Sequence, residues 1–119
     1  MLGQDKENLL RFRRTVRALV SEKVPEGRKV DDVLGGLAEK WNPLFDSVGK
    51  QNLVEDVNAL VRDFLRPIRA SFQRSLPDSK RIGALAEQLS ASKGLTRIVK
   101  REPLKRYIEL YILRCLSEI

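Results

Sequence analysis

The side chains that most often perform acid–base chemistry or bind metal ions are scarce in this sequence. It contains no histidine and a single cysteine, Cys115. Histidine is the usual general base near neutral pH and the commonest metal-binding nitrogen, so common catalytic triads and histidine zinc sites are excluded. A lone cysteine forms neither an internal disulfide nor a cysteine-rich zinc site. We therefore predict a protein that is not an enzyme, needs no cofactor and resides in the reducing cytoplasm.

Paired carboxylates are the remaining candidates for binding a hard metal ion. Asp46 is a single candidate, and the pairs are Asp31-Asp32 and Glu55-Asp56. Both lie where predicted helices begin, a position at which the helix dipole already favours acidic side chains, so capping explains them without a metal. Gly35-Gly36 has neither a preceding strand nor a following Lys-Ser or Lys-Thr, so no phosphate loop is indicated. No small-molecule substrate is evident.

Arginine is the residue type whose number and spacing could indicate a function here, the binding of an anionic partner. The chain has 23 Lys and Arg against 16 Asp and Glu, and its formal net charge is +7. The charge is segregated, because residues 1–30 carry +4, residues 31–63 carry −4 and residues 64–119 carry +7. Such segregation indicates either an anionic partner for the basic sections or pairing between oppositely charged helices within the fold.

Two groups of arginines recur at helical spacing, each opposite an apolar stripe. In a nucleic-acid-binding protein both groups would contact phosphates, whose oxygens suit the guanidinium group. In an ordinary surface helix they would form a solvated face with neighbouring acids, which is the interpretation we prefer. The groups are Arg11, Arg13, Arg14 and Arg17, and then Arg62, Arg66 and Arg69.

A third basic segment, RIGALAEQLSASKGLTRIVKR at residues 81–101, places a small Ala86 among apolar residues before a turn and a basic end. It resembles the helix-turn-helix of bacterial transcription regulators, although Ser90 replaces the usual glycine and the second part is about one residue short. The alternative, which we prefer, is an ordinary helical hairpin within a bundle. The resemblance implies base contacts from Ser92, Lys93, Thr96 and Arg97, and backbone contacts from Lys100 or Arg101.

Apolar residues recur at helical spacing along nearly the whole chain, and no strand-like alternation interrupts them. The sequence therefore predicts an all-α fold, a single compact bundle of five to seven helices with proline-marked breaks. It forms one domain over residues 1–119, either complete or cut from a longer protein. No apolar run approaches the ~18 residues of a membrane-spanning helix.

The predicted helices are bounded by prolines, glycines and capping residues. We expect a break at Asn42-Pro43 and a bend near Asp63 caused by Pro67. The expected helices cover 6–23, then 31 or 32 to 41, 52–72 with Asn52 and Glu55 as a capping pair, a short helix after Pro77, a brief one at 95–101 and a last one from Pro103 onward. The predicted core contains Trp41, Phe64, Phe72, Leu85, Tyr111 and Ile112.

The last predicted helix is apolar around most of its circumference. Either it is the buried centre of the bundle, or Tyr107, Leu110 and Leu113 remain exposed to bind another protein or a second copy of the chain. Two functions are therefore carried forward. We place first a non-enzymatic helical module for protein–protein interaction or scaffolding. The alternative is a nucleic-acid-binding protein that uses the basic helix faces and the segment at 81–101.

Overall fold

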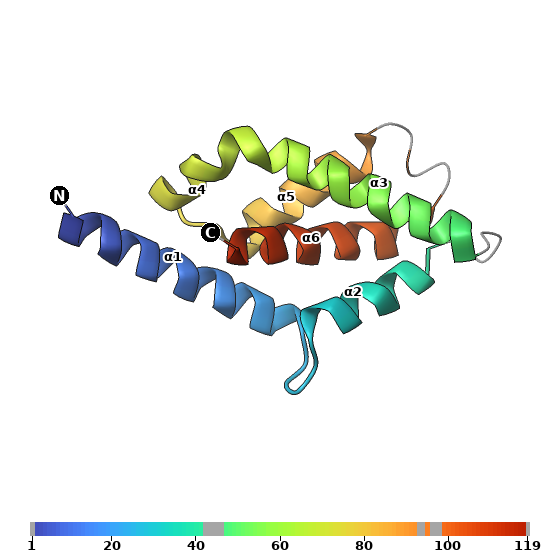
Figure 1. The fold of residues 1–119 in the computed structure, drawn as a ribbon, viewed down its shortest axis with the longest axis horizontal. Coiled ribbons are helices and arrows are strands. Elements are labelled where there is room, and N and C mark those ends of the chain that lie inside the picture. Colours follow the sequence, from blue (N-terminus) through green and yellow to red (C-terminus); the bar gives the residue numbers. More distant parts are fainter. Residues whose placement is uncertain (1, 42–46, 93–94, 96–98, 119) are drawn as a thin grey trace.

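The computed structural model describes residues 2–41, 47–92, 95 and 99–118. Over these residues the chain is a bundle of α-helices, which confirms the predicted all-α class (Figure 1). The elements are α1 (Leu2–Lys23), α2 (Val30–Glu39), α3 (Ser47–Leu65), the 3₁₀-helix η1 (Arg66–Ile68), α4 (Arg69–Arg74), α5 (Ser79–Ser90) and α6 (Arg101–Ser117).

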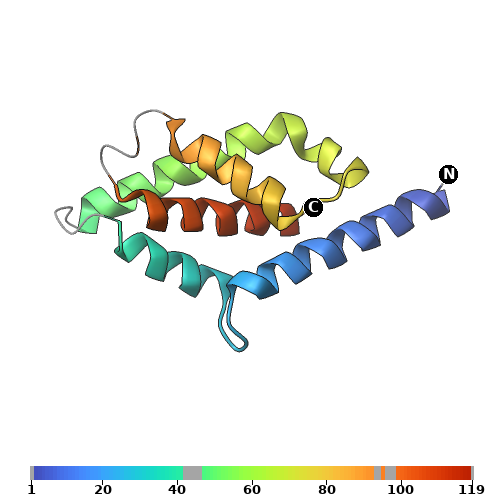
Figure 2. The ribbon, with the colours of Figure 1, turned by 180° about the vertical axis from the view of Figure 1, so that it is seen from behind.

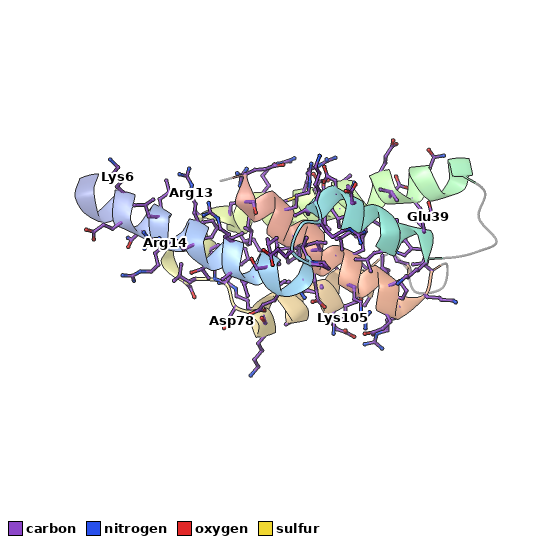
Figure 3. The ribbon with its side chains drawn as sticks, turned by 90° about the horizontal axis from the view of Figure 1, so that it is seen from below. Lys6, Arg13, Arg14, Glu39, Asp78 and Lys105 are labelled. Carbon is purple, nitrogen blue, oxygen red and sulfur yellow. The ribbon has the colours of Figure 1, made fainter. Side chains whose placement is uncertain are left out.

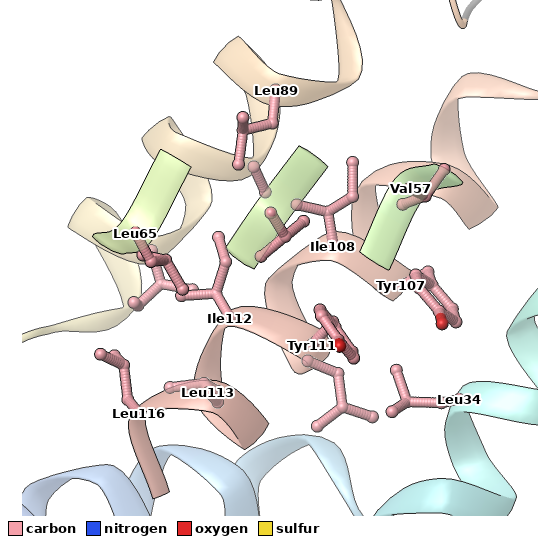
Figure 4. Close-up of a cluster of buried hydrophobic side chains, with 14 of the residues drawn as sticks. Leu34, Val57, Leu65, Leu89, Tyr107, Ile108, Tyr111, Ile112, Leu113 and Leu116 are labelled. Atoms are coloured by element: carbon pink, nitrogen blue, oxygen red, sulfur yellow. The ribbon is translucent and has the colours of Figure 1, made fainter. Parts of the chain in front are cut away.

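Helix α6 is the centre of the bundle. It packs against α1, α2, α3 and α5, and Figures 1 and 2 show it enclosed between α1 and α2 on one side and α3 on the other. Eight of its side chains are buried, and Figure 4 shows several of them reaching toward different neighbouring helices. A helix that is apolar on nearly every side is therefore explained by neighbours on nearly every side.

The residues predicted to bind a partner from this helix require correction. Tyr107 is 3% exposed, Leu110 is 1% exposed and Leu113 is fully buried. Side chains covered to this extent have no surface to offer a second chain. The apolar surplus of α6 fills the core of its own fold, because four helices surround it rather than one.

Proline breaks the third predicted helix more completely than expected. Instead of one bent helix reaching residue 72, α3 ends at Leu65 and is followed by η1, which contains Pro67, and by α4. The proline ring has no amide hydrogen and clashes with the preceding turn, so the α-helical ladder cannot continue through it. The short helix predicted after Pro77 is confirmed as α5. Asp78 caps it by accepting a hydrogen bond from the Arg81 amide at 2.7 Å.

Two predicted helix starts are wrong. Helix α3 begins at Ser47, so the expected capping pair of Asn52 and Glu55 lies inside it. The cap position of α2 is occupied by Lys29, and Asp31 and Asp32 lie in the first turn instead. Acidic residues there interact with the helix dipole without capping an amide. The expected break at 42–43 and residues 96–98 of the brief helix predicted at 95–101 lie outside the described residues, and Arg101 belongs to α6.

The core prediction is largely confirmed. Trp41, Phe72, Tyr111 and Ile112 are buried. The remaining two predicted core residues, Phe64 and Leu85, are partly buried and pack against the same cluster. The cluster contains residues from α1 through α6, so a common core joins the helices.

Helix α1 makes the molecule elongated. The molecule measures 53 × 32 × 23 Å and has a radius of gyration of 15.1 Å, against about 13 to 14 Å for a compact domain of this length. Figures 1 and 2 show the first half of α1 extending past the other helices. Phe12 and Val16, further along α1, are buried in the core. The described side chains of the projecting part, at residues 6–11, are exposed apart from the half-buried Leu9, and they include the basic Lys6 and Arg11.

Candidate functional site

The arginines of α1 divide into two sets. Burial of Phe12 and Val16 fixes the rotation of the helix. With that rotation, Arg13 and Arg17 line a depression of about 200 Å³ beside Ser117 at the end of α6. Figure 3 shows Lys6 and Arg13 on one side of α1 and Arg14 on the other. The predicted arc of four is thus split, and we call Lys6, Arg13 and Arg17, which share one side of the helix, the α1 stripe.

The second predicted group stays together. Burial of Val61 and Leu65 turns the neighbouring arginines toward the edge of α3. A depression of about 160 Å³ is lined by these arginines together with Cys115, Leu116 and Glu118 from the end of α6. The arginines are Arg62, Arg66 and Arg69, and because they extend from α3 through η1 into α4 we call them the α3–α4 stripe.

Both stripes reach the last turn of α6, one from each side. Helix α1 packs against α6 and directly against α4, which begins at Arg69, and α3 packs against α6. The carbonyl end of a helix carries partial negative charge and attracts cations, which helps to hold arginines there. The tertiary structure therefore merges two groups that are some 50 residues apart in the sequence. We call the two stripes with the last turn of α6 the basic surface.

Few carboxylates neutralise the basic surface. Among the residues that the structure describes, Lys6, Arg17, Arg62 and Arg69 form no ion pair with an Asp or Glu side chain. Arg66 pairs with Asp63 at 3.2 Å, where both side chains are largely exposed. An exposed pair of this kind contributes about 0–1 kcal/mol and leaves the guanidinium accessible. The expected face of arginines with neighbouring acids is therefore absent from most of this described surface.

Basic residues elsewhere do have acidic partners. Lys23 of α1 contacts Glu109 of α6 at 2.5 Å. Glu87 of α5 pairs with Arg101 and, at 3.4 Å, with Lys105. Glu87 and Glu109 both belong to the basic section 64–119, so these pairs do not explain the segregated charge. Arg114 of α6 pairs with Asp31 of α2 at 2.8 Å and so joins a basic section to the acidic one.

Lys100 and Arg101, the described basic residues at the end of the helix-turn-helix-like segment, do not join the basic surface. Lys93 and Arg97 lie outside the described residues. Lys100 is exposed just before α6, and Arg101 is the first residue of α6. A helix rises 1.5 Å per residue, so the first and last turns of α6 are roughly 24 Å apart.

A cleft between α2 and α3, with α6 as its floor, was missed by sequence reasoning. Its volume is about 660 Å³. The acidic side chains come from α2, and Arg62 stands at its junction with the basic surface. The helical spacing of Tyr107, Tyr111 and Arg114 could have indicated the part of this cleft that α6 contributes. Only the fold places residues of α2 and α3 opposite them. The polar lining consists of Asp31, Glu39, Asn58, Arg62, Tyr107, Tyr111 and Arg114.

Hydrogen bonds connect the polar groups of this cleft across the helices. The Tyr107 hydroxyl donates to Asn58 Oδ1 at 2.6 Å, and Arg62 donates to the Tyr111 hydroxyl at 3.3 Å. Arg114 Nε donates to Asp31 at 2.8 Å. The two tyrosine rings stack with centroids 6.0 Å apart. These bonds hold α2 and α3 to the floor of the cleft, so its polar groups have a structural role.

Burial raises the pKa of Tyr107 to about 12, although its hydrogen bond to Asn58 acts in the opposite direction. The unfolded chain ionises this phenol near pH 10. Above that pH the unfolded state releases a proton that the folded state retains, so stability present below pH 10 is lost as the pH rises toward 12. We expect the free energy of unfolding to fall by about 2 kcal/mol between pH 9 and pH 11.5 from this group. Urea denaturation of the native chain and of Tyr107→Phe at both pH values measures it, and an equal decline in the two proteins would contradict the assignment.

Other candidate chemistries find little support in the structure. Burial raises the pKa of the half-buried Cys115 thiol, which keeps it protonated. Among the described residues no group of three or more Cys, Asp or Glu side chains could hold a metal ion. None of the helices in the described ranges is long and apolar enough to cross a membrane.

The fold and the basic surface together define an α-helical bundle with a basic face. No protein-family model matches the chain, and no curated protein or solved structure shows significant similarity to it. The functional conclusion therefore rests on the geometry of the chain itself.

Proposed function

We propose that the chain acts as one non-enzymatic helical domain that binds nucleic acid through the basic surface. The observation that carries this proposal is the meeting of the two stripes at the last turn of α6. A continuous group of basic side chains favours a partner with regularly spaced negative charges, whereas scattered ones favour solubility alone. A cytoplasmic location stays a prediction from the cysteine content.

Electrostatics support a polyanionic partner. The six basic side chains of the stripes repel one another. Asp63 pairs with Arg66, whereas Glu118, which lines the depression beside Arg62, Arg66 and Arg69, pairs with Arg114. Phosphates that bind such a surface relieve this repulsion and release condensed counterions, which favours association at low salt. The guanidinium groups also match phosphate oxygens in geometry.

The protein-partner hypothesis has lost the residues that favoured it. Tyr107, Leu110 and Leu113 are core residues. The cleft between α2 and α3 leaves room for a polypeptide, but its walls carry charges of both signs and its hydroxyl groups are already hydrogen-bonded within the fold. Nucleic-acid binding is therefore the function that the described surface supports best.

Fluorescence anisotropy with labelled DNA and RNA tests the proposal. If all six basic side chains contact phosphates, affinity should fall about 10³-fold between 50 and 200 mM salt. Replacing Arg62 and Arg69 with alanine should weaken binding by at least about tenfold at 50 mM salt. The slope of log affinity against log salt concentration should decrease by an amount that corresponds to about two phosphate contacts.

A matched control separates the surface from the net charge. Lys29 and Lys80 are exposed and lie outside both stripes, so Lys29→Ala with Lys80→Ala removes the same charge without touching the site. We expect this pair to bind nearly as the native chain does. An equal loss in both pairs, no binding to any nucleic acid at 50 mM salt, or tighter binding to poly-glutamate than to DNA and RNA would each overturn the proposal.

A further inference from the structure

We infer that the basic surface binds an end of its nucleic acid, and that Arg62, Arg66 and Arg69 receive the terminal phosphate in the depression that they line beside the last turn of α6. This inference rests on the proposed function and names the part of the ligand that the α3–α4 stripe recognises. The observation that carries it is the opening of three arginines onto one small depression with apolar walls.

The backbone around Pro67 brings the three arginines together. Side chains four residues apart on a helix have Cβ atoms about 5–6 Å from each other, so Arg62 and Arg66 are neighbours. Side chains three residues apart in a 3₁₀-helix lie in line, and η1 therefore places Arg69, its C-cap, in line with Arg66. Like charges at these spacings repel one another, and an anion that lies between them relieves the repulsion.

The depression has the size of a chemical group rather than of a whole ligand. Its volume is about 160 Å³, whereas pockets that enclose a small molecule measure roughly 300–1,000 Å³. Leu65 and Leu116 in its walls are 2% and 1% exposed, and apolar walls strengthen the attraction between charges by excluding water. A backbone phosphate continues into a sugar on both sides and stays at the rim. A terminal phosphate is attached on one side only and can enter.

The charge of the depression also matches a terminal phosphate. The three guanidinium groups line it together with one carboxylate, that of Glu118, which pairs with Arg114 at 3.4 Å. A terminal phosphate carries a charge of about −1.5 to −2 at pH 7 and presents three acceptor oxygens, whereas a backbone phosphate carries a charge of about −1. Each of the three arginines can therefore donate to a different oxygen of the terminal group.

The depression on the α1 side of the basic surface suits the backbone better. It is lined by two arginines, Arg13 and Arg17, together with Val16, Val20 and Ser117. Two guanidinium groups satisfy the two free oxygens of a backbone phosphate. We therefore assign the end of the nucleic acid to the α3–α4 stripe and its continuing strand to the α1 stripe.

Fluorescence anisotropy tests the inference with one oligonucleotide that carries an internal fluorophore, single-stranded or annealed, whichever the full chain binds more tightly. Its three forms have a 5′-phosphate, a 3′-phosphate or hydroxyl groups at both ends. At 150 mM salt we expect one phosphorylated form to bind at least about tenfold more tightly than the unphosphorylated form. An unphosphorylated oligonucleotide two nucleotides longer adds a similar charge along the backbone and should gain less than about twofold.

Substitutions locate the terminal phosphate on the surface. Arg66→Ala with Arg69→Ala should abolish the preference for the phosphorylated form. Arg69→Lys keeps the charge but removes the planar fork, so it should reduce the preference at least about threefold and change the binding of the unphosphorylated form by less than about twofold. The matched control, Arg13→Ala with Arg17→Ala, should weaken the binding of every form and retain the preference. All four side chains are exposed, so circular dichroism and melting temperature should match the native chain.

The outcomes distinguish the inference from the proposed function. If no oligonucleotide binds, both fail. If nucleic acid binds but the phosphorylated forms gain no more than the longer control, the function stands and the inference is overturned. A preference that survives the loss of Arg66 and Arg69, or that both pairs of substitutions remove equally, also overturns it. A preference that is lost with Arg66 and Arg69 and retained without Arg13 and Arg17 supports it.

Discussion

Replacing Leu110 and Leu113 together with glutamate should unfold the chain. Both side chains are at most 1% exposed and lie on the central helix α6. A carboxylate placed there would lose its hydration without gaining a charged partner, and burying an unpaired charge costs several kcal/mol. Two such groups exceed what a marginally stable domain tolerates. Circular dichroism should show loss of helicity and of the cooperative thermal transition.

An exposed leucine supplies the control for this experiment. Leu10 on the projecting half of α1 is 46% exposed, so Leu10→Glu should leave helicity and melting temperature nearly unchanged. A double variant of α6 that stayed folded but lost self-association in sedimentation equilibrium would contradict the buried placement. It would also restore the docking role first predicted for these residues.

Replacing Ile112 with alanine is expected to lower the free energy of unfolding by about 2–5 kcal/mol. Ile112 is fully buried, and Figure 4 shows it inside the cluster of side chains between α6 and its neighbours. Removing three methyl or methylene groups there forfeits burial energy and leaves a cavity that close-packed neighbours fill only in part. Urea denaturation measures the loss.

Two leucine-to-alanine variants serve as controls for the loss of stability in Ile112→Ala. Leu60 is partly buried at the edge of the core, so Leu60→Ala should cost less than Ile112→Ala. Leu10→Ala should stay within about 0.5 kcal/mol of the native chain. A loss below about 1 kcal/mol for Ile112→Ala would mean that α6 is not the centre of the bundle.

The local features of this fold could be predicted well from the sequence. The all-α class, the short helix after Pro77 and the burial of Phe72 follow from spacing and residue type within one or two turns of helix. Helix starts were less predictable, because competing caps have similar energies. Asn52 resembles a cap, yet it lies within α3, where neighbouring turns continue the helical hydrogen bonding on both sides.

The candidate site could be predicted only in part. Arginine spacing correctly grouped Arg62, Arg66 and Arg69, since their arrangement depends on a short segment of helix. The same reasoning placed Arg13 and Arg14 on one face, but burial of Phe12 directs them to different sides of α1. Rotation of a helix about its axis is set by what it packs against, and a broad polar arc does not reveal it.

By itself the sequence determined the helical class, the interruption at Pro67 and the net positive charge, because these depend on backbone geometry and residue counts. The tertiary structure decided which sides of the helices are covered. It buried Leu110 and Leu113 against four neighbouring helices. It also brought the stripes of α1 and α3–α4 to one turn of α6. Contacts between residues far apart in the chain arise only when apolar faces pack together, and that packing sets which charges become neighbours.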